Sequence, residues 1–210
     1  MYKNMKEYID LTKIYPSQLK FGNYMIMHTF SYNNIQNASV LNFYNCTIDS
    51  TKSKVTCLYY NNNGSAECIM SNNLFERLTN RNFLNTANGN VLLFGLGLGV
   101  NVLPLLEDEE ISHITVVDIN SEIVDTIGPY IKNCDVNDKL TIITGDAFTH
   151  YQQLSETQFD VIYFDCWNSI NSSIRTDMEI LKELYKNNIK ETGQIMYWCE
   201  DLYTNGLINI

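Results

Sequence analysis

Short apolar runs alternate with longer amphipathic segments from residue 74 to the end of the chain. Runs that are apolar throughout are typical of strands buried on both faces, and alternation of such strands with helices gives a parallel sheet with right-handed crossovers. The predicted strands are Val91–Phe94, Ile114–Asp118, Leu140–Thr144, Val161–Asp165 and Gln194–Cys199. The predicted helices are Leu74–Thr86, Val100–Glu107, Ser121–Lys132, Ala147–Leu154 and Arg175–Lys190. This pattern predicts an α/β domain with a doubly wound, mainly parallel sheet.

The first 73 residues have a different pattern, with short β-like pieces rich in Asn, Tyr and Thr. Lys54–Tyr60 and Ser65–Ser71 are predicted to form a hairpin, because the Asn-Asn-Asn-Gly segment between them tolerates positive φ. Val40–Ile48 is predicted as a third strand, and Met1–Lys13 has helical spacing over a short length. We therefore expect a small β-rich region over residues 1–73 and an α/β domain over residues 74–210.

The length of 210 residues suits one ordinary domain with a small appendage. The 14 basic and 24 acidic residues give a formal net charge of -10, which would repel nucleic acid and anionic lipid. A small-molecule substrate, cationic or neutral, is therefore the partner we expect. A local basic patch is the alternative that charge alone leaves open, formed by Lys52, Lys54, Arg77 and Arg81.

The chain has no apolar run of about 18 residues, and Met1–Asp10 lacks the apolar core of a signal peptide. These features predict a cytoplasmic protein without a membrane segment. The six cysteines and three histidines stand far apart, without a C-x-x-C pair, so we expect no metal site and reduced thiols.

Ligands of doubly wound sheets bind beyond the carboxyl ends of the strands, where the candidate chemistry of this chain lies. Glycines at positions 95, 97 and 99 follow the first strand and allow a close approach of backbone to ligand. Asp118 ends the second strand and can accept both hydroxyls of a ribose. Asp146 follows the third strand, where it can accept the exocyclic amine of an adenine, and Asp165 ends the fourth. Asp118 and Asp146 can equally cap helices, and the two roles are compatible.

The spacing of the glycines narrows the class of nucleotide. A dinucleotide fingerprint that starts at Gly95 needs glycine at position 100, where the chain has Val100. A phosphate-binding P-loop is absent as well, because no Gly-Lys-Ser/Thr follows the glycines. The residues therefore indicate a nucleoside ligand without a phosphate chain.

Four ordered segments, 91–99, 116–120, 145–148 and 159–165, resemble successive motifs of the class I S-adenosylmethionine-dependent methyltransferases. The likeness covers residues 74–199, and the small β-rich region before it is similar to that of the spermidine-synthase-like branch. The resemblance implies a Rossmann-like fold and S-adenosyl-L-methionine as cofactor. It further implies Asp165 as the catalytic residue and a cofactor site made of Gly95, Leu96, Gly97, Gly99, Asp118, Ile119, Asp146, Ala147, Asp165 and Trp167.

Three positions depart from the aminopropyltransferases of that branch. Asn168 stands where their motif has a second carboxylate, Leu98 where they carry an acidic residue, and Pro104 where they carry a glutamate. We therefore expect methyl transfer to a small acceptor in place of spermidine synthesis. Asp165 would accept the acceptor's proton, and Tyr163 or Trp167 would offer an aromatic face to the sulfonium.

Other uses of the same ligand stay open, namely aminopropyl transfer from the decarboxylated form and lyase-like cleavage of S-adenosylmethionine. A non-catalytic binding module that keeps the fold is a further alternative. Only eleven residues follow Cys199, so we expect the sheet to end at its fifth strand. An exposed sheet edge would then favour pairing into a homo-oligomer. Glu200 and Asp201 could hold an acceptor amine or form a solvated acidic end.

Overall fold

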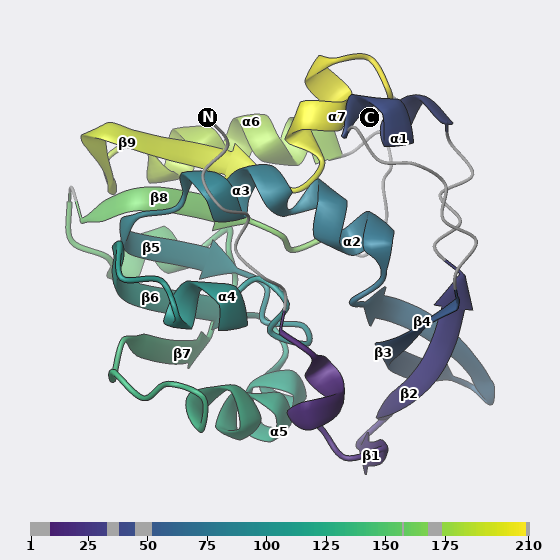
Figure 1. The fold of residues 1–210 in the computed structure, drawn as a ribbon. Coiled ribbons are helices and arrows are strands. Elements are labelled where there is room, and N and C mark those ends of the chain that lie inside the picture. The colour runs from purple at the N-terminus through teal and green to yellow at the C-terminus, as the bar shows by residue number, and fades with distance from the viewer. Residues whose placement is uncertain (1–8, 33–37, 45–51, 157, 168–173, 209–210) are drawn as a thin grey trace.

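The computed structural model describes residues 9–32, 38–44, 52–156, 158–167 and 174–208. Figure 1 shows two sheets side by side, a five-stranded one with helices around it and a smaller one made by the first part of the chain. Within the described part of the chain, no helix is long and apolar enough to cross a membrane.

The larger sheet consists of five parallel strands in the order β7-β6-β5-β8-β9. This confirms the predicted fold class. The chain builds outward from β5 in one direction and then returns to its other side, so the carboxyl ends of β5, β6 and β8 meet where the order reverses. The strand bounds are Gly89–Phe94 (β5), Ile111–Asp118 (β6), Leu140–Thr144 (β7), Phe159–Phe164 (β8) and Ile189–Tyr197 (β9).

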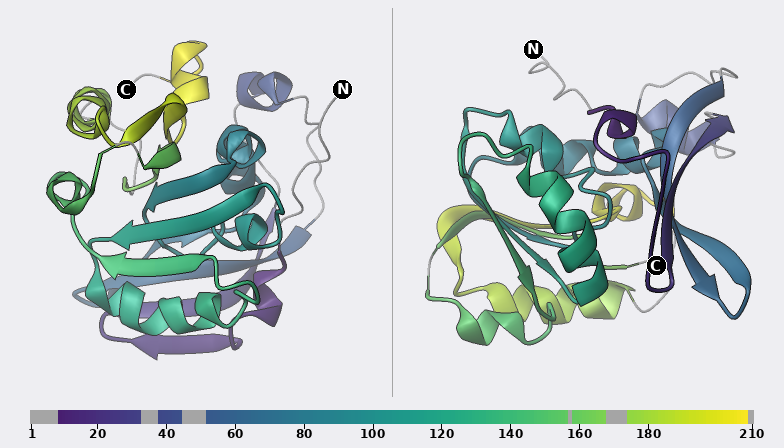
Figure 2. Two further views of the ribbon diagram at one scale, coloured as in Figure 1. Left: turned by 90° about the vertical axis from the view of Figure 1, so that its left-hand side faces the viewer. Right: turned by 90° about the horizontal axis from the view of Figure 1, so that it is seen from below.

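Helices cover both faces of this sheet, as Figure 2 shows with α5 on one side and α6 on the other. Alternate side chains of β5 enter two separate apolar clusters, Leu93 on the α5 side and Leu92 on the α6 side. Both leucines are fully buried, which explains why the strand is apolar throughout. The helices of the domain are α2 (Leu74–Thr79), α3 (Arg81–Thr86), α4 (Leu103–Leu106), α5 (Ser121–Lys132), α6 (Ile174–Tyr185) and α7 (Glu200–Thr204), with a 3-10 turn η2 (His150–Gln153).

Several of these helices are shorter than their patterns predict. The segment 74–86 forms two helices in place of one, because the side chain of Asn80 donates to the carbonyl of Glu76 and competes with the helical backbone. Turns occupy residues 97–102, so the next helix begins only beside Pro104. Helix α6 ends at Tyr185, and Lys190 lies in β9, where it pairs with Asp160 at 2.7 Å. Only the 3-10 turn η2 forms within the segment predicted as the helix Ala147–Leu154.

The small sheet is antiparallel, with the order β1-β2-β3-β4. Its second hairpin, β3 (Lys52–Asn62) and β4 (Ser65–Ser71), confirms the predicted pairing, and its turn is Asn63-Gly64. The first hairpin, β1 (Gln18–Phe21) and β2 (Tyr24–Tyr32), was not predicted from the sequence. Its turn is Gly22-Asn23, a pair that favours a two-residue loop and that could have identified it.

The predicted strand Val40–Ile48 is wrong over its described part, where α1 (Ala38–Phe43) is a short helix. Tyr44, at the end of this helix, is buried and donates to Asp201 of α7 at 2.8 Å, while Arg81 of α3 lies over its ring. This packing between α3 and α7 favours a helical turn over a strand. Residues 45–48 of this predicted strand lie outside the described residues. Residues 1–8 of the predicted helix Met1–Lys13 also lie outside them, and at the end of that segment Leu11–Lys13 forms a 3-10 turn, η1.

Candidate active site

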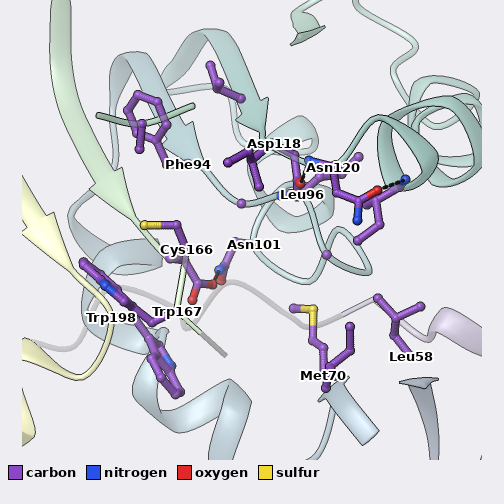
Figure 3. A pocket seen from close by; sticks show the side chains of 18 of the residues that line it. Leu58, Met70, Phe94, Leu96, Asn101, Asp118, Asn120, Cys166, Trp167 and Trp198 are labelled. Carbon is purple, nitrogen blue, oxygen red and sulfur yellow. Dashed lines mark hydrogen bonds between the residues drawn. The ribbon is translucent and has the colours of Figure 1, made fainter. Parts of the chain in front are cut away.

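A cavity of about 660 Å³ lies between the two sheets, at the carboxyl ends of β5, β6 and β8. Its floor is the glycine loop after β5, and β4 of the small sheet closes it from the opposite side. Figure 3 shows Trp167 and Trp198 on one side of the cavity, Leu58 and Met70 on another, and Asn101 between them. The volume falls within the roughly 300–1,000 Å³ usual for small-molecule sites.

The glycine loop leaves no room for a side chain at Gly95 or at Gly97. Gly95 has a φ of +100°, and a Cβ there would collide with the carbonyl oxygen of Asp165. Gly97 has a φ of +47°, and a Cβ there would collide with the sulfur of Met70. The same sulfur accepts a hydrogen bond from the backbone amide of Leu98 at 3.2 Å. The loop is therefore packed tightly between β8 and the small sheet.

Asp118, at the end of β6, is hydrogen-bonded to the glycine loop. One carboxylate oxygen accepts from the backbone amide of Leu96 at 2.8 Å, and the other accepts from that of Asn120 at 2.8 Å. The side chain of Asn120 donates to the hydroxyl of Tyr24 at 2.6 Å, which ties the end of β6 to the small sheet as well. A carboxylate has about four acceptor positions, so Asp118 keeps capacity for a ligand beside these two bonds.

Asp146 and Ala147 line the cavity after β7. Asp146 accepts from the amide of Phe148 at 2.9 Å and so caps the turn that follows. Ile119 also lines the cavity and is 72% exposed, which leaves an apolar surface free at the rim. These three residues lie on the cavity lining just after the ends of the neighbouring strands β6 and β7.

All predicted cofactor residues except Gly99 line the cavity. Gly99 lies deeper, where a Cβ would collide with the side chain of Ile131 on α5. Its glycine is required for packing of the loop against that helix, which is a structural reason for the residue and not a binding one.

Asp165 lies in the cavity at the end of β8, as its sequence position predicts. Its Oδ2 accepts from the side-chain amide of Asn101 at 2.8 Å. Burial raises the pKa of this carboxyl above its usual range, and the charge of Asp118 adds to the effect, while the bond from Asn101 lowers it. A carboxylate with a raised pKa is suited to accept a proton near neutral pH.

Glu76 of α2 is a further carboxylate of the cavity lining, and the sequence did not indicate it. Burial raises its pKa, and the nearby charge of Asp165 raises it further. The side chain of Asn80 joins the two acids, because it donates to Glu76 Oε1 at 3.2 Å and accepts from Asn101 Nδ2 at 3.0 Å. The hydroxyl of Tyr163 donates to the same oxygen of Asn80 at 2.6 Å.

The two tryptophans and Tyr163 differ in their position relative to the cavity. Trp167 and Trp198 line it, with their ring nitrogens bonded to Asp177 and Thr79, both at 3.0 Å. Tyr163 is fully buried and stacks on Phe83 with ring centroids 3.9 Å apart, so the alternative that it faces a ligand is wrong.

The acids after β9 do not reach the cavity. Glu200 accepts from the backbone amide of Tyr197, and Asp201 accepts from Tyr44. Neither residue lines the cavity, so their predicted contact with an acceptor amine finds no support. Asn168 lies outside the described residues. Over the described ranges, no group of three or more His, Cys, Asp or Glu residues is arranged to hold a metal ion.

Four important residues of the cavity could not be located from the sequence. Asn73 caps α2 and Glu76 follows three residues later. In the sequence this spacing indicates a helix cap and not a cavity residue. Asn101 follows the glycine loop by two residues, and this proximity is the one feature of the sequence that could have indicated its place in the cavity. Met70 and Trp198 lie on elements that the sequence did not place beside the loop.

The family model for the spermine/spermidine synthase domain matches residues 80–203, more than half of the chain. No curated protein matches the chain significantly.

Solved structures of low sequence identity also match. A spermidine synthase in complex with the transition state analogue AdoDATO has 13% identity and a TM-score of 0.48, with 68% of this chain and 53% of that chain covered. The spermidine synthase from Thermotoga maritima has 14% identity and a TM-score of 0.48, with 74% and 55% covered. A precorrin 8w decarboxylase from Methanobacterium thermoautotrophicum has 18% identity and a TM-score of 0.44, with 64% and 68% covered. The chain thus spans about half the length of the two spermidine synthases.

Proposed function

Because the chain belongs to the spermine/spermidine synthase domain family, with the fold of the class I S-adenosylmethionine-dependent methyltransferases, we propose that it is a transferase. Its donor is a sulfonium nucleoside of the S-adenosylmethionine type, and its acceptor is a small molecule. Methyl is the group that we propose is transferred. One observation carries the proposal: a desolvated carboxylate, Asp165, lies in the same cavity as the carboxylate at the end of β6.

The residues present fit such a donor. Asp118 has acceptor capacity for the hydroxyls of a ribose beside its two backbone bonds. Asp146, after β7, is placed to accept from the amine of an adenine. The loop at Gly95 and Gly97 lets backbone approach the ligand without Cβ atoms. When bound, S-adenosylmethionine supplies an alkyl group on a positively charged sulfur.

The protein's own contribution is orientation, exclusion of water and one proton acceptor. Both sheets line the cavity, which would bring donor and acceptor together and shield part of their surface from bulk solvent. Trp167 offers an aromatic face to a cation, an attraction of about 0.5–2 kcal/mol. Asp165, held at Oδ2 by Asn101, accepts the proton that a hydroxyl or ammonium acceptor must lose.

Aminopropyl transfer from the decarboxylated donor is a second candidate, and the charge of the cavity favours it. Glu76, Asp118, Asp146, Asp165 and Asp177 all line the cavity, and its described lining contains no lysine or arginine. A donor without a carboxylate meets less repulsion from these acids than S-adenosylmethionine does. Leu98 disfavours aminopropyl transfer, because it is fully buried and adds no acid to the glycine loop.

A binding and product assay separates these candidates. Calorimetry with S-adenosylmethionine, its decarboxylated form and NAD compares the donors, and mass spectrometry then follows products in the presence of small amines. Micromolar binding of a sulfonium donor with a methylated product supports the proposal, and an aminopropylated product supports the second candidate. Methylthioadenosine and homoserine lactone formed without an acceptor would mean cleavage. A folded protein that binds neither sulfonium donor would overturn both candidates.

A further inference from the structure

Cys57 on β3 and Cys68 on β4 are two thiols that the proposed function does not use. Both are free cysteines, Cys57 buried and Cys68 exposed. Their side chains are hydrogen-bonded to each other across the two strands. Two sulfur atoms in such contact need only a short approach to reach the roughly 2.05 Å of a disulfide bond.

A β-bulge between β3 and β4 places these two thiols on one face of the small sheet. Cys57 is paired with Ser71, and two residues further along β3 Tyr59 is paired with Cys68, three residues back along β4. The extra residue on β4 is Ile69. In a regular ladder Cys68 would lie opposite the residue after Tyr59 and would point to the other face of the sheet. The bulge therefore brings Cys68 to the face that carries Cys57 and Tyr59.

The side-chain contacts and the exposure of the two sulfurs agree with this placement. Cys57 is also hydrogen-bonded to the side chain of Tyr59, the residue opposite Cys68. Cys68 lies on β4, an edge strand, so a small reagent can reach its sulfur from solvent. Cys57 is only 5% exposed. A reagent should therefore modify Cys68 first and reach Cys57 through it.

The contact between the thiols also makes one of them easier to ionise. The hydrogen bond with Cys68 lowers the pKa of Cys57 to about 7, and the bond with Tyr59 acts in the same direction against the effect of burial. The thiolate is the form of cysteine that attacks a disulfide. Near neutral pH a large share of Cys57 is consequently ready to attack a sulfur that is bound to Cys68.

Oxidation of Cys68 would reach the glycine loop through Met70. The Sγ of Cys68 donates to the backbone carbonyl of Met70 at 3.4 Å, and a sulfur in a disulfide has no hydrogen to donate. The sulfur of Met70 in turn accepts from the backbone amide of Leu98 at 3.2 Å. A disulfide at Cys68 therefore removes a bond that holds the residue packed on the loop.

We propose that Cys57 and Cys68 form a reversible disulfide by exchange with a small-molecule disulfide, and that this modification loosens the contact of Met70 with the glycine loop. The inference goes beyond the proposed function and does not depend on the ligand of the cavity.

The exchange has two steps, and each forms one S–S bond and breaks another. The Sγ of Cys68, after its proton has passed to the neighbouring thiolate, attacks one sulfur of the small disulfide and releases the other as a thiolate. The Sγ of Cys57, once deprotonated, then attacks the Sγ of Cys68 and displaces the second small thiolate. In sum, two protein thiols are oxidised, and the small disulfide takes up two electrons and two protons to become two thiols.

Wild-type protein provides the first test, with glutathione disulfide as the oxidant near neutral pH and peptide mapping by mass spectrometry without reduction. We expect a peptide pair joined at Cys57 and Cys68 as the main product, with less than about a tenth of the chains carrying glutathione on Cys68. Excess reduced glutathione should reopen the bond. Stable glutathione on Cys68 without a bridge, or a bridge to any other cysteine, would overturn the site.

Two serine variants test the order of the steps. Cys57→Ser should stop after the first step and keep one glutathione on Cys68. Cys68→Ser should slow the modification of Cys57 at least about tenfold relative to that of Cys68 in the first variant, because Cys57 is buried. Cys134→Ser is the matched control and should form the same bridge as wild type. Equally fast modification of Cys57 in the Cys68→Ser protein would overturn the role of Cys68 as the entry point.

Amide hydrogen exchange measured by NMR tests the effect on the glycine loop. We expect the amide of Leu98 to exchange at least about threefold faster in the oxidised protein than in the reduced one, because Met70 is held less firmly. The amide of Ile114, bonded to the carbonyl of Lys139 at 2.8 Å in the larger sheet, is the internal control and should not change. Unchanged exchange at Leu98 in fully oxidised protein would overturn the link to the loop.

Discussion

Asp118 accepts a hydrogen bond from the backbone amide of Leu96 at 2.8 Å, so the carboxylate at the end of β6 fastens the glycine loop at the end of β5. The side chain is 8% exposed and its second oxygen caps the turn at Asn120. One acid therefore shapes the loop and faces the cavity. Binding and folding are coupled at this residue, and a substitution there should affect both.

Asp118→Asn should weaken the binding of a sulfonium nucleoside by about tenfold or more. The NH₂ group of asparagine is a donor, so it would meet either a backbone N–H or a hydroxyl of the ligand that needs an acceptor. The same conflict should lower the free energy of unfolding by about 1–3 kcal/mol. Calorimetry and urea denaturation measure the two effects. Asp125→Asn, at an exposed position on α5, serves as control and should leave both values unchanged. Unchanged affinity in a correctly folded Asp118→Asn protein would remove Asp118 from the binding site.

Gly97→Ala should destabilise the protein through contact with Met70 and not only through its backbone angle. Gly64 offers a matched control, because its φ of +92° is also positive but a Cβ there meets nothing within 4 Å. Both alanines carry a left-handed strain of about 1–2 kcal/mol, and only Gly97→Ala adds a collision. The double variant Gly97→Ala, Met70→Ala should recover part of the difference in thermal unfolding. Equal loss at positions 64 and 97 would contradict the packing of β4 on the loop.

Tryptophan fluorescence should report ligand binding directly, because both tryptophans of the chain line the cavity. A bound adenosine should change the emission of Trp167, which is half-buried and near the rim, more than that of Trp198, which is 8% exposed. Trp167→Leu should weaken binding of a sulfonium donor by roughly twofold to thirtyfold, the range expected for loss of a cation–π contact. Its effect on uncharged methylthioadenosine should be smaller. An equal effect on both ligands would mean that Trp167 contacts the nucleoside and not the sulfonium.

The sequence predicted the larger sheet well because its signals are local. Helix α5 begins and ends where predicted, since Asn120 caps it and Ile123, Ile127 and Ile131 form one buried face. Strand β7 also has its predicted bounds. Asp118, Asp146 and Asp165 could be placed together because the ends of parallel strands share one edge of a sheet.

The remainder of the site depends on contacts between segments far apart in the chain. Glu76 is linked to Asp165 through two amides, because Asn80, where the segment 74–86 divides into two helices, bonds to Glu76 and to Asn101, and Asn101 bonds to Asp165. Met70 closes the cavity only because β4 packs across the loop. No periodicity or motif within either segment reports such a contact, so the sequence could not reveal it.

Asp165→Asn should lower the rate of group transfer by about 10²–10⁴-fold when the acceptor must lose a proton, because the variant has no base there. Binding of methylthioadenosine should change little. In the wild-type enzyme the rate should rise with pH through the neutral range, because burial raises the pKa of Asp165 and only its ionised form accepts a proton. The rate at saturating donor, measured from pH 6 to 8.5, tests this. A flat profile with an unchanged rate in Asp165→Asn would assign Asp165 to binding alone.

His150 should make the folded protein less stable in acid. It is 3% exposed, and neither ring nitrogen has a hydrogen-bond partner among the described residues, so burial lowers its pKa from the ordinary 6.5. Above pH 6.5 the ring is neutral in both the folded and the unfolded chain, and no stability is lost. Below it the unfolded chain takes up a proton that the folded chain resists, so stability falls until the lower folded pKa is reached.

At pH 5.5 this effect amounts to at most about 1.4 kcal/mol. His150→Leu removes it, so the difference in unfolding free energy between variant and wild type should move in favour of the variant between pH 7.5 and pH 5.5. Urea denaturation at both pH values measures that change, and the comparison cancels the carboxylates that titrate in both proteins. His113→Gln is the control, because His113 is bonded to Thr141 at 3.0 Å and is only half-buried. A difference that stays constant between the two pH values would mean that His150 takes up its proton in the folded protein as readily as in the unfolded chain. Burial would then not lower its pKa, and the ring would need a partner in the loop after β7.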